Sequence, residues 1–416
     1  MAELKVPTRR LQPGMFIRLP LGWRDHPFVL SSFRIKDEGQ VLLIRQLATD
    51  WVWFDPEKSS AGPLAEASVA PLEETSGADN IRQQLQAEKS ARIEELQNYR
   101  RSLQKCEKQF EQSLRQVRSV VSKLGSRPLQ AVTEAQDLIK GMVDSLLTQD
   151  ELVLHLMGEG KEGEQLFYHS LNVSVLAMLI GKAKGLERNQ IEALGLAGLF
   201  HDIGKVKIPS AILNKNPTQL SAPERNLLAL HPRYGVDLLA NAEGFPADVK
   251  RIILEHHEAA DGSGTPKGLR GDELGDCSLL FALINAYDSL CHPSDIRMAR
   301  PPYVVLSHLY RNARDKYVAS DIELMIRQMG VYPPGTVVEL SGGQIGMVMS
   351  INPAKLLAPN VLLYDPQIPR QEAPIIALDE SNLTISKALV PGRLPEAVRE
   401  YLNPRTRISY FYEQKP

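Results

Sequence analysis

The sequence has little of what a disulfide-stabilised, secreted or membrane-spanning protein requires. Its 416 residues include only three cysteines, Cys106, Cys277 and Cys291, which are too few and too unevenly spaced for a disulfide framework or a thiolate zinc site. A bound metal would therefore need nitrogen and oxygen ligands. The first residues, MAELKVPTRRLQPGMF, lack a secretory signal, and no uninterrupted apolar run reaches the ~18 residues of a membrane helix. We therefore expect a cytoplasmic protein.

The chain also has no large excess of positive or negative charge. The formal net charge is -2 and no long basic run occurs, which argues against a nucleic acid polymer or an anionic membrane as the main partner. No nucleotide-cradling glycine loop and no internal repeat are present. We therefore expect a small substrate.

Composition divides the chain into five parts. Residues 1–57 hold short β-rich runs (FIRL, FVL, VLLIR and WVWF) and a DEG turn at 37–39, which predicts a small β-rich domain. Residues 58–79 are a polar stretch without an apolar face, typical of a linker. Residues 80–126 predict a long helix, 127–332 a helical domain, and 333–416 a C-terminal β-rich appendage. The predicted fold class is therefore mainly α, with a helical domain flanked by small β-rich regions.

The long helix predicted at 80–126 has a narrow apolar seam with steps of three and four residues. The seam consists of Leu96, Tyr99, Leu103, Cys106, Phe110, Leu114, Val117, Val121 and Leu124. Such a seam fits a coiled coil that makes a homodimer, and it fits equally a single amphipathic helix packed on its own protein.

The two regions that follow carry local signals of their own. Within 127–332, Ser221 and Glu224 form a capping-box pattern with Pro223 in the first turn, which predicts a helix start. After Pro333-Pro334-Gly335, the runs TVVEL and QIGMVMS flank a Ser-Gly-Gly turn and predict a β-hairpin, with NVLLYD as a further strand.

Histidines gather in the predicted helical domain. Of nine histidines in the chain, eight lie there, and a single histidine would more often be a core or surface residue than a ligand. His169 follows a helical apolar stripe and should point inward. His201 is adjacent to Asp202, the helix that starts near Ser221 should deliver His231, and the pair His256-His257 lies near a predicted helix end.

Imidazoles in register with a carboxylate indicate a metal site. Such nitrogen and oxygen ligands suit iron, manganese, nickel or zinc, and two such ions side by side are a device for in-line attack on phosphorus. Asp202 could bridge them. Lys205, one turn beyond His201, could place an ammonium near a scissile phosphate, although it could also be an ordinary solvated lysine.

Several motifs occur together and in order. H-S-x-x-V at His169, HDIGKVKIP from His201, HP-x-x-G at His231 and HHEAADGSGTPKGLRGDEL from His256 resemble the HD-GYP phosphodiesterase family over residues 167–302. The N-terminal β-rich region is similar to a small domain of unknown function that often precedes HD-GYP domains.

The resemblance implies a helical HD-type domain that hydrolyses cyclic di-GMP to pGpG, and onward to GMP, with two divalent metal ions, iron, manganese or nickel. The implied metal ligands are His169, His201, Asp202, His231, His256, His257 and Asn285. Lys205 and Asp202 are the implied catalytic residues, and Lys205, Arg300, Gly264, Thr265 and Pro266 the implied substrate-binding residues. The loop Gly264-Thr265-Pro266 is also where a protein partner would bind.

Three positions depart from the family pattern. Thr265 replaces the loop tyrosine, Asn285 replaces a metal-binding aspartate, and Gln165 replaces the glutamate of three-metal members, so at most two metals are expected. Asp288 is expected either to orient a ligand or to face solvent. The departures leave open a catalytically weakened protein that binds a cyclic dinucleotide or a protein partner as a signalling adaptor. A third alternative is an HD-type hydrolase of some other nucleotide.

Overall fold

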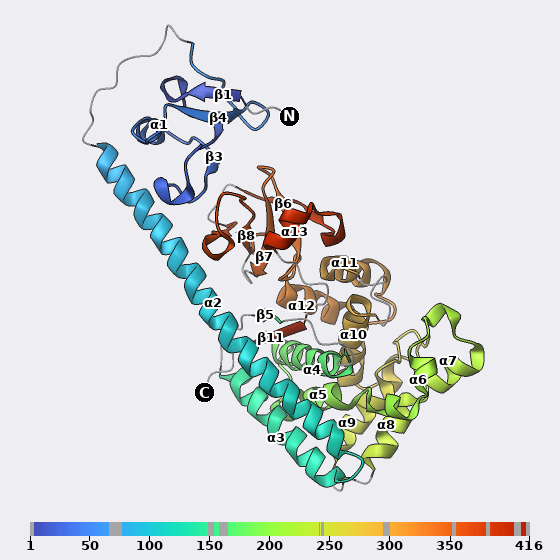
Figure 1. Ribbon diagram of the computed structural model, residues 1–416. Helices are drawn as coiled ribbons and strands as arrows, with labels where there is room; N and C mark the ends of the chain where they lie inside the picture. Colours follow the sequence, from blue (N-terminus) through green and yellow to red (C-terminus); the bar gives the residue numbers. More distant parts are fainter. Residues whose placement is uncertain are drawn as a thin grey trace.

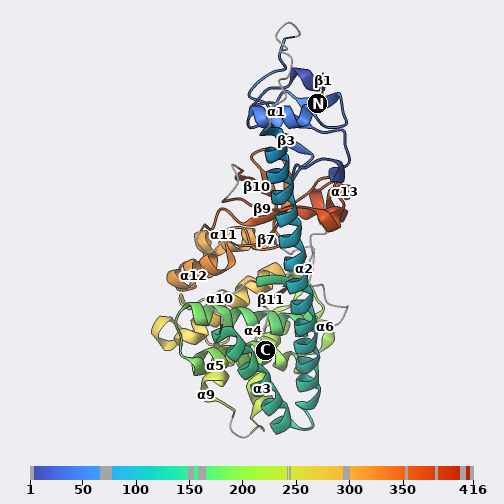
Figure 2. The ribbon, with the colours of Figure 1, turned by 90° about the vertical axis from the view of Figure 1, so that its left-hand side faces the viewer.

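The protein is built along one long helix, α2 (Gly77–Lys123). The computed structural model describes residues 4–65, 77–148, 154–157, 165–240, 242, 245–293, 300–351, 355–379, 383–402 and 409–412. The N-terminal domain lies at one end of α2, the helical domain lies at the other end, and a C-terminal sheet lies beside the middle of α2 (Figures 1 and 2). One helix therefore contacts all three units.

The N-terminal domain is a four-stranded antiparallel sheet in the order β1-β4-β2-β3. Alternate residues of β4 point to opposite faces, so Val52 and Phe54 are buried while Trp51 and Trp53 are partly exposed. The elements are β1 (Leu4–Pro7), η1 (Thr8–Arg10), β2 (Phe16–Arg18), η2 (Trp23–Asp25), β3 (Ser32–Arg34), α1 (Glu38–Arg45) and β4 (Trp51–Asp55).

Two of the strand predictions in this domain are wrong. The run VLLIR lies in helix α1, and FVL at 28–30 forms no strand. The DEG sequence is the start of α1 rather than a turn, because the Asp37 side chain accepts a hydrogen bond from Gln40 N at 2.9 Å and caps the helix. A short apolar run fits a strand and a buried helix equally well, so the cap decides the outcome.

The N-terminal domain is fixed to α2 and to the C-terminal sheet. The buried Lys89 of α2 donates its ammonium protons to Trp23 O and, at 2.8 Å, to His26 O, and it also lies over the Trp23 ring. Arg24 pairs with Glu372 of the C-terminal region. These contacts hold the first domain against both neighbours.

The lower half of α2 packs on its own chain. Its seam residues from 106 to 124 are buried, Val121 only partly, in one cluster with α3 (Pro128–Leu147) and the helical domain. The Phe110 ring lies 5.4 Å from the Tyr168 ring and 5.5 Å from the Phe411 ring. The side chains of Leu96 and Tyr99 lie outside the described residues. For the seam from 106 to 124, the structure favours the amphipathic helix over the homodimeric coiled coil.

The helical domain surrounds α4. This helix is buried on all sides from Ser170 to Gly181. Its mean hydropathy of 1.2 would suit a membrane span, but 67% of the apolar window is buried inside the protein, as in a core helix. The domain comprises α4 (Gln165–Ala183), α5 (Arg188–Phe200), η4 (Ile203–Lys207), α6 (Ser210–Leu213), η5 (Pro217–Gln219), α7 (Ala222–Leu228), α8 (His231–Leu239), α9 (Ala247–Glu255), η6 (Gly271–Glu273), α10 (Asp276–Cys291), α11 (Pro302–Asn312) and α12 (Ala319–Met329).

The capping box predicted at Ser221 is confirmed. Ser221 Oγ accepts from Glu224 N, and the Glu224 carboxylate accepts from Ser221 N at 2.9 Å, which starts α7. The sequence predicted that His231 lies on that helix, and this prediction is wrong. Because α7 ends at Leu228, His231 is instead the first residue of α8.

The C-terminal sheet contains the predicted hairpin. Strands β6 and β7 pair antiparallel, within the five-stranded order β10-β6-β7-β8-β9. The elements are β6 (Val337–Leu340), β7 (Ile345–Ser350), β8 (Asn360–Leu363), η8 (Arg370–Glu372), β9 (Ile375–Ala377), β10 (Ile385–Leu389), η9 (Pro391–Arg393) and α13 (Glu396–Leu402).

The last strand leaves this sheet. Strand β11 (Ser409–Tyr412) pairs antiparallel with β5 (Leu154–Met157), and its residues Tyr410, Phe411 and Tyr412 are buried in the core of the helical domain. The appendage predicted at 333–416 therefore divides into a separate sheet and a strand that completes the helical core.

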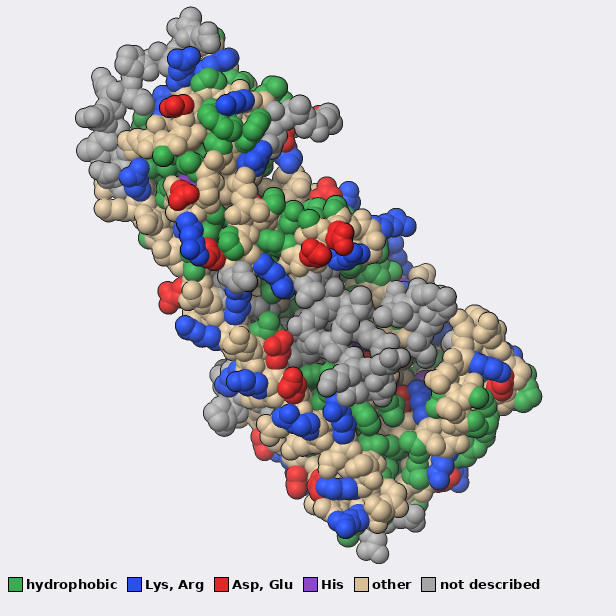
Figure 3. Space-filling view, viewed as in Figure 1, with side chains coloured by type: hydrophobic (Ala, Val, Ile, Leu, Met, Phe, Trp, Pro, Cys, Tyr) green, Lys and Arg blue, Asp and Glu red, His purple; other side chains and the backbone are tan. Residues whose placement is uncertain are grey.

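Basic and acidic side chains alternate over the outer surface. On the face seen in Figure 3, Lys and Arg are interspersed with Asp and Glu along α2 and over the N-terminal domain. Since neither sign dominates, this face offers no extended field for a polyanion.

We expect the α2 seam to stabilise the protein internally. Phe110→Ala removes a side chain that is 2% exposed between two aromatic rings, and it should lower the free energy of unfolding by about 3–5 kcal/mol. The exposed Gln116→Ala on the same helix should change it by less than about 0.5 kcal/mol. Urea unfolding of both variants measures the difference, and equal stabilities would contradict the packing described here.

Candidate metal centre

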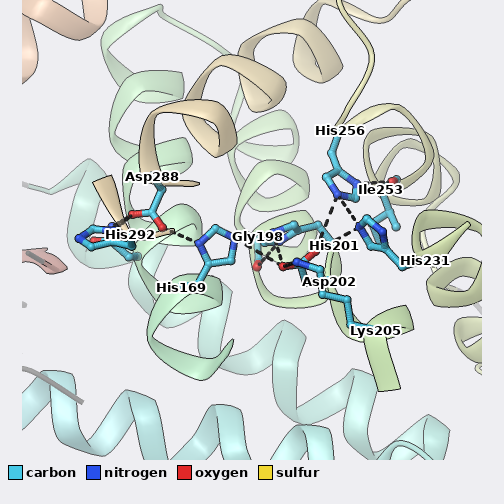
Figure 4. Close-up of polar contacts among 11 residues, drawn as sticks. His169, Gly198, His201, Asp202, Lys205, His231, Ile253, His256, Asp288 and His292 are labelled. Atoms are coloured by element: carbon cyan, nitrogen blue, oxygen red, sulfur yellow. Dashed lines mark hydrogen bonds and ion pairs between the residues drawn. The ribbon is translucent and has the colours of Figure 1, made fainter. Parts of the chain in front are cut away.

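Six side chains converge from the ends of four helices, and Figure 4 labels five of them, His169, His201, Asp202, His231 and His256. His169 comes from the first turns of α4, and His201 and Asp202 come from the end of α5. His231 is the first residue of α8, while His256 and His257 follow the last residue of α9. The potential ligand atoms form two groups, and within each group all lie within 4.8 Å of one another: His169, His201 and Asp202; and Asp202, His231, His256 and His257. Asp202 belongs to both groups.

A close approach of two backbones brings the groups together. The turn η4, directly after Asp202, lies against the start of α8, and a Cβ at Gly204 would lie only 1.9 Å from His231 O. Glycine is therefore required at this position of the HDIGK motif. The contact places the Asp202 carboxylate beside the His231 imidazole.

Backbone carbonyls fix the tautomers of three histidines. Nδ1 of His201 donates to Gly198 O at 3.0 Å, Nδ1 of His231 to Leu228 O at 2.7 Å, and Nδ1 of His256 to Ile253 O at 2.6 Å. A carbonyl oxygen only accepts, so each Nδ1 carries the proton and each neutral ring has its lone pair on Nε2. This hydrogen-bonding pattern is typical of imidazoles that ligate a metal through Nε2.

The lone pairs of these rings face one another. Nε2 of His169 lies 3.0 Å from Nε2 of His201, and Nε2 of His231 lies 3.1 Å from Nε2 of His256. Asp202 Oδ1 lies 3.2 Å from His231 Nε2 and is buried without a hydrogen-bond donor. Acceptors at such distances repel unless a cation lies between them, so this donor set fits a pair of divalent ions.

Burial keeps the ligands in the state that binds a metal. It lowers the pKa of His201 to about 3 and the pKa of His256 well below its usual value. Burial also acts to raise the pKa of Asp202, but Lys205, with Nζ 2.6 Å from Oδ2, and the neighbouring imidazoles hold that pKa well below its usual value. At neutral pH the imidazoles of His201 and His256 are therefore neutral and the Asp202 carboxylate is ionised. For His169, burial acts to lower the pKa, but the hydrogen bond with Asp288 raises it above the usual value.

Asp288 lies next to this cluster and is fully buried. Its Oδ2 accepts from His169 Nδ1 at 2.5 Å, and its Oδ1 accepts from His292 Nδ1 at 3.0 Å. Asp288 was expected either to orient a ligand or to face solvent, and the structure shows it buried and hydrogen-bonded to two histidines. Asn285, one turn earlier on α10, is 3% exposed, and its Oδ1 is buried without a hydrogen-bond partner.

A cleft of about 480 Å³ opens onto the cluster. Side chains of both signs line it, among them His169, Asp202, Lys205, Lys215, Asp288 and His292. Gln165 is also part of its wall. Two lysines beside a buried metal-ligand set provide a site for an anionic ligand.

Four residues predicted to bind substrate are not part of this cleft wall. Arg300 is exposed, and its backbone N–H donates to Leu290 O at 3.3 Å near the end of α10. Arg297, the other arginine that the sequence offers for this role, lies outside the described residues. Gly264 packs on the backbone behind the site, where a Cβ would lie 2.4 Å from Glu258 Cα, and Thr265 N donates to His257 O at 3.0 Å. The loop Gly264-Thr265-Pro266 therefore supports His257 from behind, and contact of these residues with substrate stays a prediction.

His292 was not among the candidates from sequence. Its spacing of four residues from Asp288 was the available signal, because such pairs meet on a helix face. The structure places it in the cleft wall and in contact with Asp288.

Comparison with known proteins identifies two domains. Residues 3–135 match a domain of unknown function, DUF3391, and residues 147–320 match the HD domain.

Several proteins named as phosphodiesterases are similar to the chain, one over most of its length and others over about a third of it. The chain is 29% identical to cyclic di-GMP phosphodiesterase PA4108 of Pseudomonas aeruginosa over 86% of this chain and 84% of that protein. It is 32% identical to the cyclic di-GMP phosphodiesterase response regulator RpfG of Xanthomonas campestris over 33% of this chain and 36% of that protein. It is also 32% identical to 3'3'-cGAMP-specific phosphodiesterase 2 of Vibrio cholerae, over 36% of this chain and 29% of that protein.

Among solved structures, the chain is similar to Bd1817, a HDG"Y"P protein from Bdellovibrio bacteriovorus, with 16% identity and a TM-score of 0.42 over 78% of this chain and 98% of that one. The order of the two matched domains agrees with the resemblance carried by the sequence motifs. The chain therefore carries a DUF3391 domain followed by an HD domain, and it is similar to cyclic di-GMP phosphodiesterases.

Proposed function

We propose that the protein is a metal-dependent phosphodiesterase that hydrolyses cyclic di-GMP to the linear dinucleotide pGpG. The observation that carries the proposal is the sharing of the Asp202 carboxylate by two histidine groups at the base of a cleft. The names of the relatives supply the substrate class. The proposal agrees with the cytoplasmic location that we expect from the sequence.

Each group would hold one divalent ion. His169, His201 and Asp202 are the proposed ligands of the first ion, and Asp202, His231, His256 and His257 of the second. When bound, two such ions polarise a phosphoryl oxygen and make a water acidic enough to attack phosphorus. Asn285 is proposed as a further ligand through its buried amide oxygen.

Lys205 is the proposed catalytic cation. Its ammonium lies 2.6 Å from Asp202 Oδ2, and its side chain, 32% exposed, reaches the cleft. In that position it would neutralise charge that develops on the phosphate and donate a proton to the departing 3′ oxygen. The ion pair with Asp202 holds the ammonium beside the metal ligands.

One observation favours a second function. An amide at Asn285 adds no charge to hold a cation and is a weaker ligand than a carboxylate. A protein with reduced metal occupancy would bind the cyclic dinucleotide without turnover and signal through its flanking domains. The test is to load the purified protein with Mn²⁺ or Fe²⁺, offer cyclic di-GMP and 3'3'-cGAMP separately, and follow linear products by chromatography.

Loss of the shared ligands should abolish turnover. We expect His201→Ala and Asp202→Ala each to reduce metal content and to lower the rate of cyclic di-GMP hydrolysis by at least about 100-fold. His308→Ala, a histidine outside both groups, is the matched control and should keep both. Metal analysis and product chromatography measure the two effects, and full activity in Asp202→Ala would contradict the proposal.

Loss of the Lys205 ammonium should affect the rate rather than the metals. Lys205→Met should lower kcat by about 100-fold or more, while both ions stay bound. The exposed Lys207→Met on the same turn should have wild-type kinetics. Equal kcat values for the two variants would remove Lys205 from the catalytic machinery.

A carboxylate at position 285 should strengthen metal binding. We expect Asn285→Asp to raise metal occupancy at limiting Mn²⁺, because it adds a negative charge at a buried site. Metal analysis after gel filtration compares the variant with the wild type. Equal metal content in both would count against Asn285 as a ligand.

A further inference from the structure

A chain of buried polar contacts connects the C-terminal strand to the proposed metal centre. It runs from the Tyr410 backbone through Asn172 and Asp288 to His169. We propose that Asn172 and the backbone amide of Tyr410 are positioning groups, which hold Asp288 so that His169 presents Nε2 to a metal. The inference rests on the proposed metal centre and deepens it.

Asn172 has only one possible orientation. Its side chain is 1% exposed, its Oδ1 accepts from Tyr410 N at 2.6 Å, and its Nδ2 donates to Asp288 Oδ1. A backbone N–H can only donate and an ionised carboxylate can only accept, so reversing the amide would place two pairs of like groups together. The two partners therefore fix the amide, and the amide fixes the carboxylate.

The carboxylate in turn fixes His169. Both oxygens of Asp288 act as acceptors, Oδ2 from His169 Nδ1 at 2.5 Å and Oδ1 from His292 Nδ1 at 3.0 Å. With Nδ1–H donated to Asp288 Oδ2, the ring of His169 has its lone pair on Nε2, which faces Nε2 of His201 at 3.0 Å. The other three histidines with defined tautomers use backbone carbonyls instead. Of these four histidines, His169 is oriented by side chains, through Asp288 and Asn172.

Strand β11, which supplies the Tyr410 amide, is firmly packed in the core. The rings of Tyr410, Phe411 and Tyr412 are at most 1% exposed, and Tyr412 OH donates to Met142 O at 2.7 Å. The backbone of β11 also pairs with β5. Because the strand is anchored on both sides, the Tyr410 amide is a rigid reference point for Asn172.

The arrangement predicts a selective effect. Within the described part of the chain, the contact with Asp288 is made by His169 of the first group, whereas His231, His256 and His257 of the second group make no polar contact with Asp288, Asn172 or β11. Loss of the Asn172 amide should therefore weaken one metal site and spare the other. A residue with a merely structural role would weaken both sites or neither.

The test is a Co²⁺ titration of the full chain, followed by calorimetry and by the visible absorption of bound Co²⁺. For Asn172→Leu we expect one of two sites to weaken by about 10–100-fold, with the second site at its wild-type affinity. Ser174→Ala is the matched control, since Ser174 is buried on the same helix and donates to Gly195 O at 2.8 Å, away from Asp288. It should bind two ions as the wild type does.

Two further variants separate the contributions. Asn172→Asp keeps the size of the side chain and the acceptor for Tyr410, but it sets a second carboxylate against Asp288 and should weaken the same site. Should Asn172→Leu fail to fold, this variant still decides the question. Tyr410→Phe keeps the backbone amide and should bind both ions normally, because its hydroxyl is not part of the contacts.

Wild-type affinity at both sites in Asn172→Leu or Asn172→Asp would overturn the inference, and so would an equal loss at both sites. A wild-type protein that binds no Co²⁺ would instead overturn the proposed metal centre. The two failures are therefore distinguishable.

Discussion

The structure of the site depends on one buried anion. The Asp202 carboxylate is almost completely removed from water, and a lone buried charge is strongly unfavourable unless neighbouring groups compensate it. Lys205 compensates one oxygen, while the other faces imidazole nitrogens that carry lone pairs. The ends of the four helices therefore meet at a point where imidazole lone pairs and a carboxylate oxygen face one another. The close backbone contact that Gly204 permits places the Asp202 carboxylate between the two histidine groups.

The site was largely predictable from the sequence because its members lie at fixed spacings near helix ends. Adjacent His256 and His257 diverge on an ideal helix, so they could face one centre only at a terminus or with two metals between them, and the structure places the pair directly after α9. The capping box at Ser221 was predictable because it is a local pattern. The helix that carries His231 was missed, although Pro232 in the first turn of α8 is a helix-start signal.

What the sequence could not predict depends on contacts across long separations. The run VLLIR fitted a strand and a helix, and only the cap at Asp37 decided between them. Asn172 lay within an apolar helix and resembled any buried amide, because its partner Tyr410 follows 238 residues later. For Arg300, the resemblance to a family motif implied a place near the phosphate, but the described cleft wall does not include it.

Strand β11 has a consequence for how the helical domain folds. Residues 409–412 complete the core around α4, and Tyr410 lies 238 residues after its partner Asn172. The helical domain therefore cannot complete its core before the chain has been synthesised at least to residue 412. Until then three aromatic side chains and one strand are missing and His169 lacks its reference point, so the proposed reaction centre forms late in folding.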